Sequence, residues 1–287
     1  MLTVLFDGIA FGALLFLLAL GLSVTLGIMN FVNLAHGAFA MLGGYVAVVL
    51  LNRWGVSFFY CLPIAFIVPA LVGVVLERTL YARLYNANPL DQVLFTMGIV
   101  FASMAMASYF MGAQHQIVQL PNFLQGQFHL FAGLDVGVYR LFLIGFCGVI
   151  ALLLHFALMR TRFGSRLRAA VDNGRIARGL GINVNRLFVI TFGVGSGLAG
   201  LAGALGIEIF DVDPVFPVKF LIYFLIVVAV GGTGTVGGPL AAALILGIFD
   251  VAGKYYISQI SAFVIYAVMV GMLIWRPQGL FGRSVTR

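Results

Sequence analysis

The sequence predicts an all-α protein, a polytopic bundle of transmembrane helices with about 8–10 membrane segments, some of them short and discontinuous. Of its 287 residues, 62% are hydrophobic and only 9% are charged, whereas a soluble domain carries about a quarter charged residues. So few charges cannot build a water-facing surface, and lipid must cover much of the outside. No charged stretch is long enough to form a soluble domain, so residues 1–287 are predicted to form a single transmembrane domain.

Apolar runs of about 20 residues, the length that spans a bilayer, define the predicted elements. The stretch from Gly8 to Asn52 contains no charged residue and has room for two spans, broken near Asn30–Asn33. Single spans are predicted from the other long apolar runs, which are Val56–Leu76, Gln92–Gly112, Leu141–Met159, Leu187–Ile207 and Tyr255–Trp275.

The remaining apolar stretch, Phe220–Phe249, is too long for one helix and short for two. Its middle, Gly231–Pro239, is rich in glycine and ends in proline. Because both residue types break helices, two short segments around a glycine-rich turn are predicted. Broken helices of this kind line pathways or pack closely against other helices. Gly232, Thr233 and Thr235 are therefore candidate residues of a translocation pathway.

Charged residues predict how the chain is oriented in the membrane. Between Arg160 and Arg186 lie seven Arg residues and a single acid, Asp172. Placing this segment in the cytoplasm puts twelve basic residues inside and four outside, as the positive-inside rule requires. Reading Phe220–Phe249 as one span would move the C-terminal Arg residues outside. The N-terminus is therefore predicted to be external and the C-terminus cytoplasmic.

Several other functions are not expected from the residues. The net charge of +7 comes almost entirely from one loop, which argues against nucleic-acid binding. Two G-x-G-x-x-G stretches, Gly195–Gly200 and Gly232–Gly237, lack the βαβ context of a nucleotide site. Neither the cysteines nor His36 show metal-ligand spacing, and no convergent nucleophile or acid–base set stands out. We expect no catalytic residue, no metal and no cofactor bound by this chain.

The most polar part of the first 52 residues is Asn30–Gly37. Amides and an imidazole in an apolar region are costly unless they are paired or face a water-filled cavity. Asn30, Asn33 and His36 are therefore candidates for a pathway lining. The competing interpretation is a hydrogen-bonded turn near the inner surface, which is favoured for Asn30 and Asn33.

The basic loop at about 160–186 has an ordered pattern. Leu167, Ala170, Val171, Ile176 and Leu180 recur at helical spacing with Arg residues between them. This predicts short amphipathic helices on the cytoplasmic surface. Such a loop either docks a soluble partner or only fixes the membrane topology through its positive charge. The regular spacing of the apolar residues favours docking. The candidate docking residues are Arg166, Arg168, Ala169, Asp172, Arg175, Ala177, Leu180 and Gly181.

Four segments together resemble the permeases of branched-chain amino-acid ATP-binding-cassette importers. Gly21–Gly37 resembles the N-terminal signature of that family, and the loop Arg168–Ile182 resembles its cytoplasmic coupling loop. Gly231–Pro239 is similar to its late glycine-rich segment, and Arg276–Gly282 to its C-terminal signature. The resemblance runs in the right order over nearly the whole chain. One departure is Gly174 in Asp172–Arg175, where a helix former is usual, which leaves the helical continuity of the loop open.

The resemblance implies a multi-pass permease of the bacterial inner membrane that works by alternating access. Its implied partners are a second related permease, expected as a heterodimer, two cytoplasmic ATP-binding subunits and an extracytoplasmic binding protein. ATP and Mg²⁺ would bind those partner subunits, because this chain has no P-loop lysine motif. The implied substrates are branched-chain amino acids, with urea, short amides or aromatic acids as alternatives. An ATP-independent secondary carrier is the competing class, although the spans hold few of the charges it would need.

Overall fold

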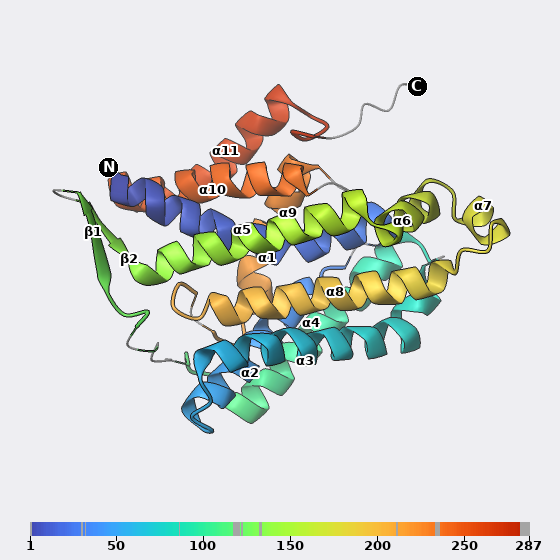
Figure 1. Cartoon of the computed structure of the whole chain (residues 1–287), viewed down its shortest axis with the longest axis horizontal. Coiled ribbons are helices and arrows are strands. Elements are labelled where there is room, and N and C mark those ends of the chain that lie inside the picture. The colour runs from blue at the N-terminus through green and yellow to red at the C-terminus, as the bar shows by residue number, and fades with distance from the viewer. Residues whose placement is uncertain are drawn as a thin grey trace.

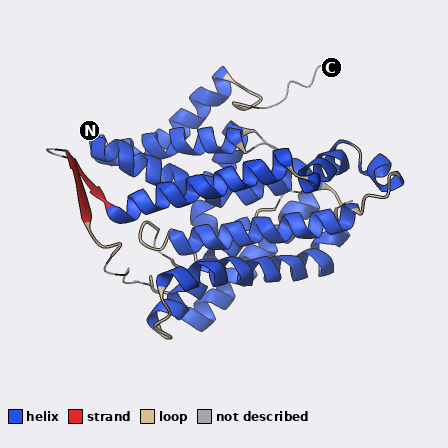
Figure 2. Cartoon of the chain, viewed as in Figure 1, coloured by secondary structure: helices blue, strands red, loops and turns tan. Residues whose placement is uncertain are grey.

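A computed structural model describes residues 2–29, 31, 33–85, 87–116, 121, 123–131, 134–210, 212–232 and 236–281. Helices form most of this part of the chain (Figures 1 and 2). The first half contains α1 (Leu2–Met29), α2 (His36–Asn52), α3 (Phe58–Thr79), η1 (Tyr81–Leu84), α4 (Pro89–Met111), β1 (Gln127–Phe131) and β2 (Leu134–Gly137). The second half contains α5 (Val138–Arg160), α6 (Arg162–Asp172), α7 (Gly174–Gly179), α8 (Val184–Leu205), α9 (Phe216–Gly231), α10 (Gly237–Tyr256), η2 (Ser258–Ile260) and α11 (Ser261–Trp275).

The predicted fold class is confirmed: the chain is a multi-pass all-α membrane protein. Among the residues that the structure describes, six helices are long and apolar enough to cross a membrane by length and composition, namely α1, α3, α4, α5, α8 and α10. Three shorter apolar helices, α2, α9 and most of α11, accompany them. The predicted break in Phe220–Phe249 is also confirmed, because α9 ends at Gly231 and α10 begins at Gly237.

Burial separates a central layer of the bundle from a peripheral one. In α1 and α8, 83% and 78% of the most apolar stretch is buried within the protein, against 17% in both α4 and α5. A helix that is apolar all round and buried belongs to the core, whereas one that is apolar and exposed faces lipid or a partner. The interior therefore forms around α1 and α8.

Glycines permit the closest helix contacts in this interior. A Cβ added at Gly203 of α8 would overlap the carbonyl oxygen of Ala40 in α2, and one at Gly43 would overlap Gly200. Similarly, a Cβ at Gly12 of α1 would lie 2.7 Å from the carbonyl oxygen of Ala243 in α10. Small residues let helix backbones approach in lipid, so close packing explains these glycines.

The two ends of the bundle differ. We call the end that carries α6 and α7 the basic end, and the opposite end, with β1, β2 and the start of α1, the hairpin end (Figure 1). The hairpin was not predicted. Its strands pair antiparallel, with Gln127 opposite Gly137 and Phe128 opposite Val136.

Candidate functional site

At the basic end, the predicted amphipathic segment forms two short helices, α6 and α7. Thr161 caps α6 by accepting a hydrogen bond from the Gly164 amide at 3.2 Å. The helix stops at Asp172, and the Asn173 side chain then accepts from the amides of Arg175 and Ile176 at 3.1 and 3.0 Å. Asn173 is thus the N-cap of α7. The open question at Gly174 is resolved, because the loop is two capped helices and not one continuous helix.

One face of α6 and α7 anchors them to α8. Leu167 and Ala170 of α6 pack with Ala177 of α7 and with Val184 and Leu187 of α8. Ala177, predicted to be a docking residue, is only 1% exposed. It therefore holds the loop in place and does not contribute to its outer surface.

The opposite face is exposed and combines charge with apolar side chains. Ile176 and Leu180 are 60% and 75% exposed, and among the predicted docking residues Arg166, Asp172, Arg175 and Gly181 are exposed as well. We call this face, formed by Arg166, Val171, Asp172, Arg175, Ile176 and Leu180, the docking face. Large apolar side chains that are exposed to solvent on an anchored loop are typical of a partner-binding surface.

The other predicted docking residues have local roles. Arg168 donates from Nη1 to the carbonyl oxygen of Leu158 at the end of α5, so it helps to fix the corner between α5 and α6. Ala169 is half-buried. Gly181 has a φ of 80°, a left-handed conformation that glycine adopts without strain. It ends the loop after α7, and a larger residue there would disturb the turn.

Residues 33–36 form a hydrogen-bonded turn inside the bundle. Asn33 is 1% exposed, and its Oδ1 accepts from the Ala35 amide at 3.1 Å and from the Tyr81 hydroxyl at 3.2 Å. His36, 2% exposed, donates from Nε2 to the carbonyl oxygen of Leu18 at 2.8 Å. The protein's own groups thus pair with both side chains, as the favoured interpretation of Asn33 expects. Asn30 lies outside the described residues, and a pathway role for these residues stays a prediction.

Asn33→Ala should destabilise the protein more than Tyr81→Phe. The first change leaves two buried donors, the Ala35 amide and the Tyr81 hydroxyl, without their acceptor, at about 1–3 kcal/mol each. The second removes one donor and leaves Asn33 Oδ1 bonded to Ala35. The midpoint of thermal unfolding in detergent measures the difference. Equal midpoints for the two variants would contradict the proposed hydrogen bonds.

The glycine-rich break meets the C-terminal segment. Gly232 is buried with a φ of 85°, and the Leu280 amide donates to the carbonyl oxygen of Val230 at 2.7 Å. A Cβ at Gly279 would lie 2.9 Å from the Gly232 nitrogen. Two of the segments that carry the family resemblance therefore touch each other. Thr233 and Thr235, the other predicted pathway residues of this break, lie outside the described residues.

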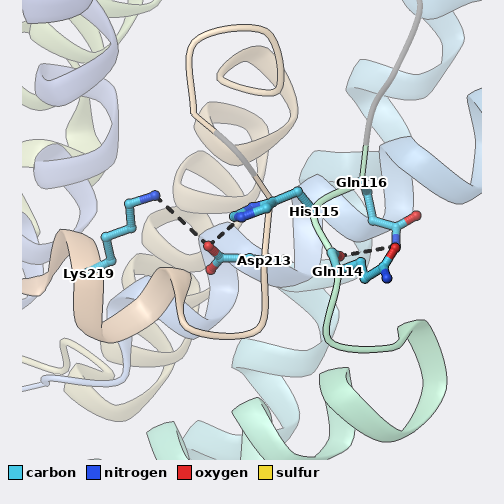
Figure 3. Close-up of polar contacts among 5 residues, drawn as sticks. All are labelled: Gln114, His115, Gln116, Asp213 and Lys219. Atoms are coloured by element: carbon cyan, nitrogen blue, oxygen red, sulfur yellow. Dashed lines mark hydrogen bonds and ion pairs between the residues drawn. The ribbon is translucent and has the colours of Figure 1, made fainter.

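At the hairpin end, polar groups gather in two places. Arg140 pairs with Asp7 beside a cavity of about 590 Å³ that Gln125, Gln127, Tyr139 and Glu208 help to line. Burial raises the pKa of Glu208, and the nearby charge of Arg140 partly opposes that rise. The second gathering is around Asp213, with His115 and Lys219 on either side (Figure 3).

Sequence reasoning missed most of the partners in these clusters. Tyr81, Tyr45 and His115 were not singled out, since a single tyrosine or histidine has no local pattern to mark it. Lys219 was used only to count charges. Asp250 and Lys254 pair at 2.6 Å, and their spacing of four residues on a helix is a local signal that the sequence does carry. Within the described ranges, no three His, Cys, Asp or Glu side chains lie close enough to hold a metal ion.

Comparison with known proteins gives a consistent result over nearly the whole length. The family described as branched-chain amino acid transport system / permease component matches residues 4–273. The chain is 30% identical to a probable branched-chain amino acid transport permease protein LivH from Methanocaldococcus jannaschii, over 97% of this chain and 92% of the relative. It is 26% identical to the high-affinity branched-chain amino acid transport system permease protein LivH of Escherichia coli, over 97% and 94%.

The chain is also similar to a second permease of the same organism. It is 28% identical to the Escherichia coli high-affinity branched-chain amino acid transport system permease protein LivM, over 92% of this chain and 67% of the relative. No solved structure matches the chain.

Proposed function

The chain belongs to the family of permease components of branched-chain amino acid transport systems, and we propose that it is the membrane-spanning subunit of an ATP-binding-cassette importer for branched-chain amino acids. In this role it moves substrate inward by alternating access, and partner ATPases drive the change. The observation that carries the proposal is the docking face, with Ile176 and Leu180 exposed at 60% and 75%. A channel or carrier that works alone has no use for such a surface.

The basic end is proposed to face the cytoplasm. The arginines of α6 and α7 lie there, and Arg83 lies in η1, whose neighbour Tyr85 packs against Phe188 near the start of α8. The hairpin end has fewer basic residues, among them Arg140, which is paired with Asp7. The positive-inside rule then supports an external N-terminus and a cytoplasmic C-terminus.

The proposed assembly contains two permeases, two cytoplasmic ATP-binding subunits and an extracytoplasmic binding protein. The likeness to both LivH and LivM of one Escherichia coli transport system supports a related, non-identical second permease. The ATP-binding subunits dock on the docking face and hold the ATP and Mg²⁺. The binding protein delivers substrate at the hairpin end.

Co-purification tests whether the docking face holds the ATPase. We expect Ile176→Glu combined with Leu180→Glu to weaken retention of the ATP-binding subunit by at least about tenfold, because apolar anchors dominate such interfaces. Trp54→Glu is the control, since it places glutamate on another exposed large apolar residue (72%), in the turn after α2. It should keep wild-type retention.

Gly181→Trp is a poorer test of docking. Gly181 has a φ of 80°, so a tryptophan there would strain the loop backbone as well as block the docking face. Two results would contradict the proposal. One is that the double variant retains the ATPase as well as the control does. The other is that the purified chain binds no ATPase and still transports leucine alone in liposomes, which would establish a secondary carrier.

A further inference from the structure

Asp213 at the hairpin end is contacted from two elements that are far apart in sequence. Its Oδ2 lies 3.5 Å from Nδ1 of His115, which follows α4, and 3.9 Å from Nζ of Lys219 in α9. The two side chains approach it from opposite sides (Figure 3). The Gln116 amide donates to the carbonyl oxygen of Val212 at 3.2 Å and so joins the two connections. Tertiary packing therefore holds the cluster together.

Neither His115 nor Lys219 makes a close hydrogen bond to Asp213. Charge-assisted N–H···O bonds are about 2.7–2.9 Å long, so separations of 3.5 and 3.9 Å leave both side chains free to turn to another acceptor. His115 and Lys219 are also well exposed, at 59% and 47% of their side chains. The Asp250–Lys254 pair differs, because its atoms are in direct contact at 2.6 Å.

Two buried polar atoms beside this cluster have no partner. Asp213 is 7% exposed and Tyr45 of α2 is 6% exposed, yet Asp213 Oδ1 and the Tyr45 hydroxyl make no hydrogen bond within the described part of the chain. A Cβ at Gly44, next to Tyr45, would lie 3.2 Å from a Val212 methyl group, so this part of α2 packs against the connection that carries Asp213. Burying each such atom unpaired costs about 1–3 kcal/mol, which requires an explanation.

We propose that Asp213, Tyr45, Lys219 and His115 form a binding site for the charged head group of a zwitterionic amino acid on its way through the permease. This assignment rests on the proposed importer function and adds the residues that meet the substrate. Asp213 Oδ1 and the Tyr45 hydroxyl oxygen accept the α-ammonium group, while Lys219 and His115 turn from Oδ2 to the α-carboxylate.

The charges of the site fit this class of substrate. The carboxylate of Asp213 and the ammonium of Lys219 sum to zero, and a zwitterion adds one charge of each sign, so every charge has a partner. A simple carboxylic acid would draw Lys219 away and leave the buried Asp213 carboxylate without a partner, which is unfavourable, and an amine would leave Lys219 without an acid partner. None of the proposed contacts of the four residues involves the side chain of the substrate. Leucine, isoleucine and valine should therefore be accepted alike.

The test uses the complete transporter in proteoliposomes, with loaded binding protein outside and ATP inside. Leucine uptake and ATP hydrolysis stimulated by the binding protein are measured together. Asp213→Asn, Tyr45→Phe and Lys219→Gln should each lower uptake roughly 10- to 100-fold, as for loss of a buried charged hydrogen bond, while stimulated hydrolysis is retained. Lys219→Arg should restore uptake. Asp250→Asn and Lys254→Gln are matched controls that should leave both readouts near wild type.

The outcomes separate the site from the function that it presupposes. If the wild-type complex takes up no branched-chain amino acid, the importer proposal fails and the site fails with it. If the wild type transports and the cluster variants transport equally well, only the site is wrong. If uptake and stimulated hydrolysis fall together, the cluster is a structural ion pair and not a substrate site. His115→Gln and Lys219→Gln alter exposed side chains, so they decide the matter even if Asp213→Asn does not fold.

Discussion

Gly203→Ala should prevent stable folding of the bundle. The added Cβ would overlap the carbonyl oxygen of Ala40 and lie 2.7 Å from its carbonyl carbon. Backbone atoms cannot rotate away as a flexible side chain can, so α2 and α8 must separate along their whole contact. We expect a cost at or above the upper end of the range of about 1–3 kcal/mol that overpacking produces, in a contact at the centre of the protein.

Gly98→Ala is the matched control for this change. Gly98 lies in the exposed helix α4, and a Cβ there would meet no atom within 4 Å. The same substitution should then be neutral or stabilising by about 0.5–1 kcal/mol, because alanine is the better helix former. Size-exclusion profiles of detergent extracts after stepwise heating compare the two. The packing argument is wrong if both variants lose their monodisperse peak at the same temperature.

Gly164→Ala should weaken docking of the ATPase without lowering the stability of the helix bundle. A Cβ at Gly164 would overlap the carbonyl oxygen of Leu158 at the end of α5, the same oxygen that accepts from Arg168. The corner between α5 and α6 must open, so the docking face moves away from its position over α8. We expect retention of the ATPase to fall by about tenfold or more, equivalent to at least about 1.4 kcal/mol, while the bundle still melts as in the wild type.

Gly174→Ala controls for the added methyl group within the same loop. A Cβ at Gly174 meets nothing within 4 Å at the start of α7, so the corner and the docking face should keep their positions. Co-purification of each variant with the ATP-binding subunit, alongside its thermal midpoint, gives both readouts. Equal retention by the two alanine variants would show that the α5–α6 corner does not position the docking face.

The features predicted correctly from the sequence depend on local properties. The length of an apolar run fixes whether a segment can span a bilayer, which located the long spans. Tyr255–Trp275, predicted as one span, instead holds the end of α10 and the 15-residue helix α11. Glycine and proline interrupt a helix whatever its tertiary packing, so they indicated the break between α9 and α10. Leu167 and Ala170 revealed an amphipathic helix because helical periodicity lies in neighbouring residues. The proposed partners come from the family resemblance, since no residue pattern alone could name them.

The predictions that were incomplete depend on contacts between distant segments. Ala177 and Leu180 look alike in the sequence as apolar residues of one loop, and only the packing on α8 shows that the first is buried and the second exposed. The hairpin of β1 and β2 lies in a segment without apolar length or charge, the two signals that located the helices. Asn33 was a candidate pathway residue, and only the fold shows that the Tyr81 hydroxyl, 48 residues later, donates a hydrogen bond to it.

The sequence by itself determined that this chain is a membrane bundle, where its spans lie, which loop is basic and amphipathic, and to which family it is related. Tertiary structure alone decided which groups meet: Leu280 with Val230, His36 with Leu18, and His115 and Lys219 with Asp213. The physical reason is that hydropathy and periodicity act within a few residues along the chain. Close approach of helices instead depends on how glycine-lined surfaces fit together, and that fit brings Tyr45 and Asp213 to one place.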